Sequence, residues 1–126
     1  ELKHIVDVMI TQMYDSGGVG LAAPQIGISK RIIVIDTSKQ RTRDNIKILV
    51  NPRCVWTSKE TNTGEEGCLS VPGKTCKVNR ANSIEIVYQE PSGQSRTFLF
   101  NGYPSRVVQH ELDHLDGTLI IDKAIV

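Results

Sequence analysis

Residues 109–117 read QHELDHLDG, and this stretch contains the pattern H-E-x-x-H between His110 and His114. Two histidines four positions apart lie on one face of an α-helix, about one turn from each other, so both imidazoles can reach a single divalent ion. Glu111 would border the same ion, where a carboxylate can take a proton from water and pass it to a leaving amine. The pattern therefore predicts a helix that carries a metallohydrolase site.

The third metal ligand must come from elsewhere, because catalytic zinc-type sites use three protein ligands and leave one position open. The few residues that follow His114 leave no room for a thermolysin-like arrangement, in which a glutamate ligand lies further downstream. Ile120 occupies the position at which the metzincin pattern requires a histidine. Spacing alone does not choose among the upstream candidates, which are His4, Cys54, Cys68 and Cys76.

Two upstream segments accompany the histidine pair. Residues 18–25 read GVGLAAPQ, and residues 66–70 read EGCLS. With QHELDH at 109–114, they resemble the three ordered motifs of the peptide deformylases, which are G-x-G-L-A-A-x-Q, E-G-C-L-S and Q-H-E-x-D-H. All three motifs are complete here, and the set spans residues 18–114 of 126. The resemblance selects Cys68 as the third metal ligand, beside His110 and His114.

The resemblance implies a hydrolase that removes the N-formyl group from the N-terminal methionine of newly synthesised proteins and releases formate. It implies that the Gln25 side chain and the backbone N–H of Leu69 stabilise the tetrahedral oxyanion, while Glu111 carries the proton to the departing amine. It also implies Fe²⁺ as the working ion, with Zn²⁺, Ni²⁺ or Co²⁺ able to substitute. Thiolate and imidazole ligands suit several of these first-row ions.

The resemblance further implies where a substrate would lie. The positions that match the family's substrate site are Val19, Gly20, Gly67, Tyr103, Arg106 and Val107. The nascent peptide would run as an added strand along the glycines of this set, because an edge backbone offers sequence-tolerant hydrogen bonds. Some relatives carry aliphatic residues at the positions of Tyr103 and Arg106, and a larger apolar residue at that of Gly64. Three charged residues near the motifs could orient the ligands or be solvated surface charges: Glu66, Arg80 and Asp113.

Length and composition indicate a single domain. With 126 residues and 39% hydrophobic content, we expect a single peptide deformylase-like catalytic domain over residues 1–126. A net charge of +1, without charge runs, indicates no nucleic-acid or membrane surface, and neither a membrane span nor a signal peptide is visible. Three cysteines without disulfide-like spacing indicate a reducing compartment, and we interpret Cys54 and Cys76 as core or neutral residues.

Local patterns predict an α+β fold of antiparallel strands. The stripe Leu2, Ile5, Val6, Met9 and Met13 predicts an opening helix, ended by residues 15–18, with His4 on its surface. We expect strands at 31–36, at 46–56 with a bend at residues 51–52, and in a hairpin of 83–90 and 96–100 around a turn at 91–93. Turns are expected at 61–64 and 71–73, and the H-E-x-x-H helix between 102–105 and Gly117. That the strands surround this helix is implied by the family fold.

The remaining expectations concern partners and alternatives. Because Glu1 is not Met, we expect that a stretch found in relatives is missing before it. We expect the cytoplasm as the location, or an organelle of bacterial origin if the missing stretch was a transit peptide. Bacterial relatives carry a C-terminal extension that docks on the ribosome, so a chain that stops at Val126 should bind ribosomes weakly. A metallopeptidase of other specificity and a catalytically silent peptide- or metal-binding module are the competing functions.

Overall fold

The computed structural model describes residues 1–39, 45–67 and 75–117. The elements, in chain order, are α1 (Leu2–Asp15), β1 (Gly20–Ala22), the 3-10 helix η1 (Ala23–Ile26), β2 (Ile32–Ile35), β3 (Lys47–Thr57), β4 (Thr61–Gly67), β5 (Thr75–Ala81), β6 (Ser83–Gln89), β7 (Ser95–Asn101) and α2 (Tyr103–Leu115). None of the helices among these described residues is long and apolar enough to cross a membrane.

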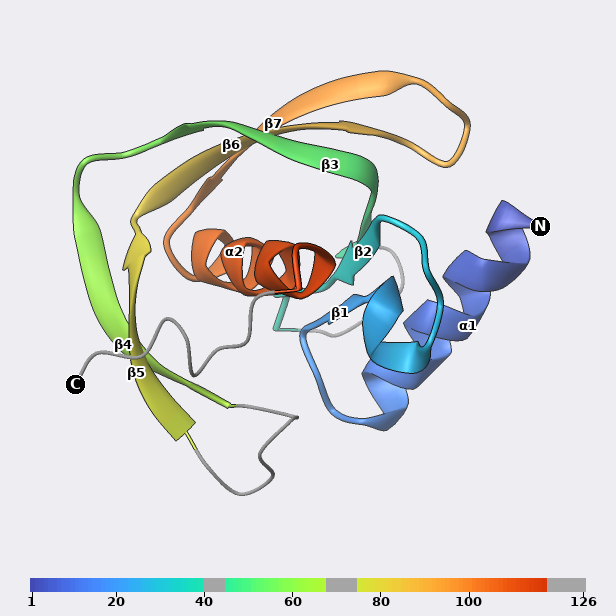
Figure 1. The fold of residues 1–126 in the computed structure, drawn as a ribbon, viewed down its shortest axis with the longest axis horizontal. Coiled ribbons are helices and arrows are strands. Elements are labelled where there is room, and N and C mark those ends of the chain that lie inside the picture. The colour runs from blue at the N-terminus through green and yellow to red at the C-terminus, as the bar shows by residue number, and fades with distance from the viewer. Residues whose placement is uncertain (40–44, 68–74, 118–126) are drawn as a thin grey trace.

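The strands form two antiparallel sheets around helix α2. One sheet has the order β1-β2-β3-β6-β7, and the second consists of β4 and β5. Figure 1 shows α2 in the middle of the fold, with β3, β6 and β7 arching over it and the β4–β5 hairpin to one side. Helix α1 packs outside, against β1 and β2. The predicted α+β class, with antiparallel strands around the H-E-x-x-H helix, is confirmed.

The position of strand β2 between two hydrophobic clusters explains why its sequence is an unbroken apolar run. Successive side chains of a strand point to opposite faces, and both faces of β2 are covered. Ile33 and Ile35 pack into the cluster around α2, whereas Ile32 and Val34 pack into the cluster under α1. The α1 side of this second cluster consists of Val6, Met9, Ile10 and Met13, which lie on the predicted helical stripe or beside it. The strand thus joins the two hydrophobic clusters.

The predicted β6–β7 hairpin and the helix ends are confirmed. Ile84, Ile86 and Tyr88 alternate with less buried neighbours along β6, and their side chains face the cluster around α2. Glycine with positive φ is found at the turn (Gly93, φ 95°) and after α2 (Gly117, φ 76°), where an L side chain would be strained.

One local prediction needs correction. Residues 61–64, predicted as a turn, begin strand β4, which pairs with the unpredicted strand β5 from Thr61↔Ala81 to Gly67↔Thr75. Strand pairing across the chain overrides the weak local turn signal of this polar segment. The predicted bend at residues 51–52 is confirmed as an irregularity within the long strand β3: Asn51 has φ 51°, and the pairing of β3 with β6 shifts between Val50 and Arg53. The turn predicted at 71–73 lies outside the described residues.

Candidate active site

Helix α2 brings the two motif histidines together. The Nε2 atoms of His110 and His114 lie 3.2 Å apart. Nitrogen ligands at about 2.0–2.1 Å from a tetrahedral ion would be separated by about 3.3 Å, so this spacing fits two ligands of one divalent ion. Burial and the neighbouring His110 lower the pKa of His114, which favours the neutral imidazole that binds metal. The donor set on this helix face therefore suits the metal that the resemblance implies.

Glu66, at the end of β4, fixes the orientation of His110. Its Oε1 lies 2.9 Å from His110 Nδ1, so a proton on Nδ1 can be donated to the carboxylate, which leaves Nε2 for an ion. Arg80 donates to both carboxylate oxygens, at 3.0 and 2.8 Å, and Arg106 donates to Oε2 at 2.6 Å. Burial alone would raise the pKa of Glu66, but the hydrogen bonds from His110, Arg80 and Arg106 and the charge of Arg80 lower it to about 2.

These contacts decide whether Glu66, Arg80 and Asp113 orient the metal ligands or are solvated surface charges. Glu66 and Arg80 are buried, and Arg80 Nη1 also donates to Asp113 Oδ2 at 2.6 Å. None of the three is a solvated surface charge, because the Asp113 side chain is itself only 16% exposed. The network thus joins strand β5 to the helix turn between the two histidines. Such outer contacts orient metal ligands in known sites.

Glu111 presents a carboxylate that lacks a complete set of partners. It is 5% exposed, and its buried Oε1 makes no hydrogen bond to any of the described residues. Burial raises the pKa of Glu111 to about 7, against the opposing effect of the His110 charge. Buried polar atoms are nearly always paired, so this oxygen is suited to a water, an ion or a substrate group. A carboxyl with a pKa near neutrality can both accept and release a proton.

Gln25 reaches the same region from helix η1. Its Oε1 accepts a hydrogen bond of 2.8 Å from the backbone N–H of Ala22. The oxygen is thereby engaged, and the amide nitrogen is the group that can donate to a bound molecule. This is the orientation that an oxyanion donor requires.

The predicted site residues meet in one pocket of about 320 Å³. Its lining includes the six predicted substrate-binding residues and three other predicted site residues: Val19, Gly20, Gly67, Tyr103, Arg106, Val107, Gln25, His110 and Glu111. His114 adjoins this set through His110. Cys68 and Leu69 lie outside the described residues. Among residues 1–39, 45–67 and 75–117, no three His, Cys, Asp or Glu side chains form a complete metal site.

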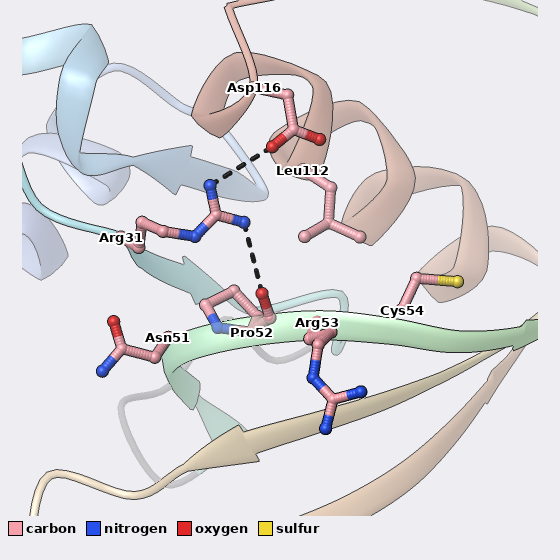
Figure 2. Close-up of a pocket in the computed structure, with 7 residues that line it drawn as sticks. All are labelled: Arg31, Asn51, Pro52, Arg53, Cys54, Leu112 and Asp116. Carbon is pink, nitrogen blue, oxygen red and sulfur yellow. Dashed lines mark hydrogen bonds and ion pairs between the residues drawn. The ribbon is translucent and has the colours of Figure 1, made fainter.

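A second pocket, of about 370 Å³, contains none of the predicted site residues (Figure 2). There Arg31 spans the space between α2 and β3, with its guanidinium 3.2 Å from Asp116 Oδ1 and 3.3 Å from the Pro52 carbonyl oxygen. Cys54 lines this pocket and is exposed, while Cys76 is half-buried on β5, so of the two predicted interpretations, core or neutral, the core one is wrong for both cysteines. His4 is exposed on α1, as predicted. The pocket lined by His110 and Glu111 is the candidate active site.

Sequence reasoning did not single out the clamp that attaches α2 to β5. Gln109 Nε2 donates to the Ala81 carbonyl oxygen at 2.9 Å, and the Ala81 N–H donates to Gln109 Oε1 at 3.2 Å. Ser105 Oγ donates to the same carbonyl oxygen at 3.0 Å. The place of Gln109 in the motif beside His110 could have marked it as a residue of interest. Nothing in the sequence around Ser105 indicated its contact with Ala81.

Known proteins resemble this chain over nearly its whole length. The model of the family described as polypeptide deformylase matches residues 1–125. A peptide deformylase from Picosynechococcus sp. is 41% identical over 98% of this chain and 66% of its own length. A Plasmodium falciparum peptide deformylase structure aligns with a TM-score of 0.93 at 44% identity, over 98% of this chain and 73% of that chain.

A Met-Ala-Ser-bound class I type b peptide deformylase from Acinetobacter baumannii aligns with a TM-score of 0.88 at 38% identity, over 97% of this chain and 80% of that chain. The chain spans about two-thirds of the length of the first two curated relatives that it matches, at 66% and 65%. The match of the family model over nearly the whole chain, with three complete motifs, shows that this chain belongs to the polypeptide deformylase family.

Proposed function

We propose that this protein is a metal-dependent peptide deformylase, which hydrolyses the N-formyl amide of nascent formyl-methionyl polypeptides and releases formate. The observation that carries the proposal is the paired His110 and His114 Nε2 atoms, 3.2 Å apart, next to a buried Glu111 carboxylate oxygen without a partner among the described residues. A pair of metal-binding imidazoles beside a carboxylate is an arrangement that metal-assisted amide hydrolysis uses. Family membership restricts the amide to the formyl group.

We propose Cys68, His110 and His114 as the metal ligands and Fe²⁺ as the working ion. The place of Cys68 in the segment EGCLS at residues 66–70, which matches the family motif, supports it as the third ligand. When bound, the ion would lower the pKa of a water toward neutrality and polarise the formyl carbonyl. Intrinsic affinity favours zinc over ferrous iron, so the ion found in isolated protein need not be the most active one.

The chain's own residues would handle the substrate and the proton. The Glu111 carboxylate would take a proton from the attacking water and deliver it to the departing amine. The Gln25 amide nitrogen and the backbone N–H of Leu69 would donate to the developing oxyanion. The peptide would extend along the pocket edge formed by Val19, Gly20 and Gly67, since the two glycines have no side chain to cover the backbone. The Met-Ala-Ser complex of the Acinetobacter relative supports a peptide that begins with methionine.

Formate release from formyl-Met-Ala-Ser, measured on protein with one verified metal ion per chain, tests the proposal. We expect formate in stoichiometric amounts with free Met-Ala-Ser, and no cleavage of the unformylated peptide. Cleavage of internal peptide bonds instead would indicate the competing metallopeptidase function. Metal binding without any turnover would indicate a silent binding module.

The choice of metal needs its own measurement. Apoprotein reconstituted without oxygen should be faster with Fe²⁺ than with Zn²⁺, and Ni²⁺ or Co²⁺ should give comparable, air-stable rates. Activity of the iron form should decline in air, because both the ion and a cysteine thiolate can be oxidised. Equal rates for the iron and zinc forms at one ion per chain would contradict the iron assignment.

A further inference from the structure

Arg106 makes contacts that its expected place in a substrate pocket does not explain. The side chain comes from the second turn of α2 and is only 10% exposed. Nη1 donates to Glu66 Oε2 at 2.6 Å and to the Val78 carbonyl oxygen at 3.1 Å. Nη2 donates to the Asn62 carbonyl oxygen at 2.9 Å and also to the Asn62 side-chain oxygen. One guanidinium thus binds α2 to both strands of the β4–β5 hairpin.

The hairpin depends on such side-chain contacts for its position. Strands β4 and β5 pair with each other and form a sheet of their own, separate from the five-stranded sheet. Their far end carries Glu66 and Gly67, which face the candidate active site together with His110. This end is connected to α2 by Arg106, by the contacts of Arg80 and by the hydrogen bond between His110 and Glu66, whereas Gln109 and Ser105 attach α2 to Ala81 at the other end of the hairpin.

Gly64 provides the space that the guanidinium occupies. A Cβ atom at Gly64 would lie 3.1 Å from Arg106 Cζ and 3.3 Å from both Nε and Nη2. Those separations are tighter than ordinary contacts, so the guanidinium would have to shift by a few tenths of an ångström, and that shift would strain its hydrogen bonds to Asn62, Glu66 and Val78. A side chain at position 64 would thus occupy part of the space that the Arg106 guanidinium fills.

We propose that Arg106 is a positioning residue, and that Gly64 is the partner that allows it to act. The guanidinium, lodged against Gly64, holds the β4–β5 hairpin at the distance from α2 at which Glu66 orients His110 toward the metal and Gly67 borders the substrate. The inference rests on the proposed deformylase function. It differs from a substrate-contact role, because Arg106 acts through Glu66 and the hairpin.

The proposal predicts a particular pattern of defects. If the guanidinium is displaced, Glu66 loses one of its donors and the hairpin end can shift, so both metal affinity and KM should suffer. Loss of a contact that orients a metal ligand typically weakens metal binding roughly 10- to 100-fold. The kcat of fully loaded, saturated enzyme should change much less, since Glu111 lies on α2 and Gln25 on η1, and neither belongs to the β4–β5 hairpin that would shift.

A double-mutant cycle measures this coupling. Co²⁺ would be titrated into the apo forms of wild type, Gly64→Ala, Arg106→Ala and the double variant, with the dissociation constant read from the visible absorption of bound Co²⁺. Each single change should weaken Co²⁺ binding roughly 10- to 100-fold. In the Arg106→Ala background, Gly64→Ala should add nothing, because no guanidinium remains for the methyl group to displace.

The controls separate this result from general destabilisation. Arg96→Ala removes an exposed arginine of the β6–β7 hairpin, paired with Glu90 at 3.3 Å, and should leave the Co²⁺ dissociation constant unchanged. Circular dichroism verifies that each variant is folded. If Arg106→Ala does not fold, Gly64→Ala and Arg106→Lys decide, since a lysine keeps the charge but cannot reach all three partners at once.

Two outcomes would overturn the inference: wild-type Co²⁺ affinity in the folded variants, or independent, additive effects of the two substitutions. The titration does not require turnover. Failure of the wild-type protein to release formate would therefore refute the proposed function without deciding the role of Arg106.

Discussion

Gly20→Ala should displace the Glu111 carboxylate while changing only one methyl group. The Cβ atom of an alanine at position 20 would lie 2.9 Å from Glu111 Oε2, 3.2 Å from Glu111 Cγ and 3.0 Å from Val107 Cγ1. Gly20 is in strand β1, whose pairing with β2 at Ile35 keeps the backbone from moving away. Most of the adjustment must therefore come from the side chain of Glu111.

The geometry sets the expected magnitude. Ordinary van der Waals contacts begin at 3.4 Å, so the carboxylate must move by about half an ångström. A misplacement of about 1 Å in a catalytic arrangement can cost roughly a hundredfold in rate. We therefore expect kcat to fall about tenfold, which corresponds to about 1.4 kcal/mol of activation free energy. Overpacking at this buried contact should also lower the free energy of unfolding by about 1–3 kcal/mol.

The assay is formate release at saturating substrate, with metal content measured on the same sample. Gly18→Ala is the matched control, because a Cβ at position 18 meets Ser16 Oγ at 3.4 Å, the Gly20 carbonyl oxygen at 3.6 Å and the Met13 carbonyl oxygen at 3.7 Å, all ordinary contacts. Gly20→Ala should be clearly slower than this control at equal metal loading. A Gly20→Ala enzyme with unchanged kcat would show that the position of the Glu111 carboxylate does not limit turnover.

Three further predictions address proton transfer, metal binding and the core. Glu111→Gln should keep the metal but lose several orders of magnitude in formate release, since an amide cannot transfer the proton; substantial turnover would exclude Glu111 as the base. Cys68→Ala should lower both metal content, measured by atomic emission, and activity, because two imidazoles hold an ion weakly; full metal at full rate would refute the ligand assignment. Met9→Ala, at a fully buried α1 position, should cost about 2–5 kcal/mol in urea unfolding, and a change well below 1 kcal/mol would show that the α1 cluster contributes little.

The sequence by itself determined those features that depend on near neighbours. The helical stripe of α1, the hairpin of β6 and β7 and the glycine after α2 were predicted, because periodicity and turn chemistry act over a few residues. The histidine pair was predicted for the same reason, since four positions on a helix place two side chains on one face. The buried run of β2 was recognised as a strand, although its two-faced burial was not visible.

Only the tertiary structure decided how distant segments meet. Strand β4 was mistaken for a turn because its stability comes from pairing with β5, and not from its own polar residues. The role inferred for Arg106 depends on Gly64, and the placement of Glu111 depends on Gly20; these partners are far apart in the chain and have no common local pattern. Close packing makes one side chain's position depend on the space left by another, and that dependence exists only once the chain has folded.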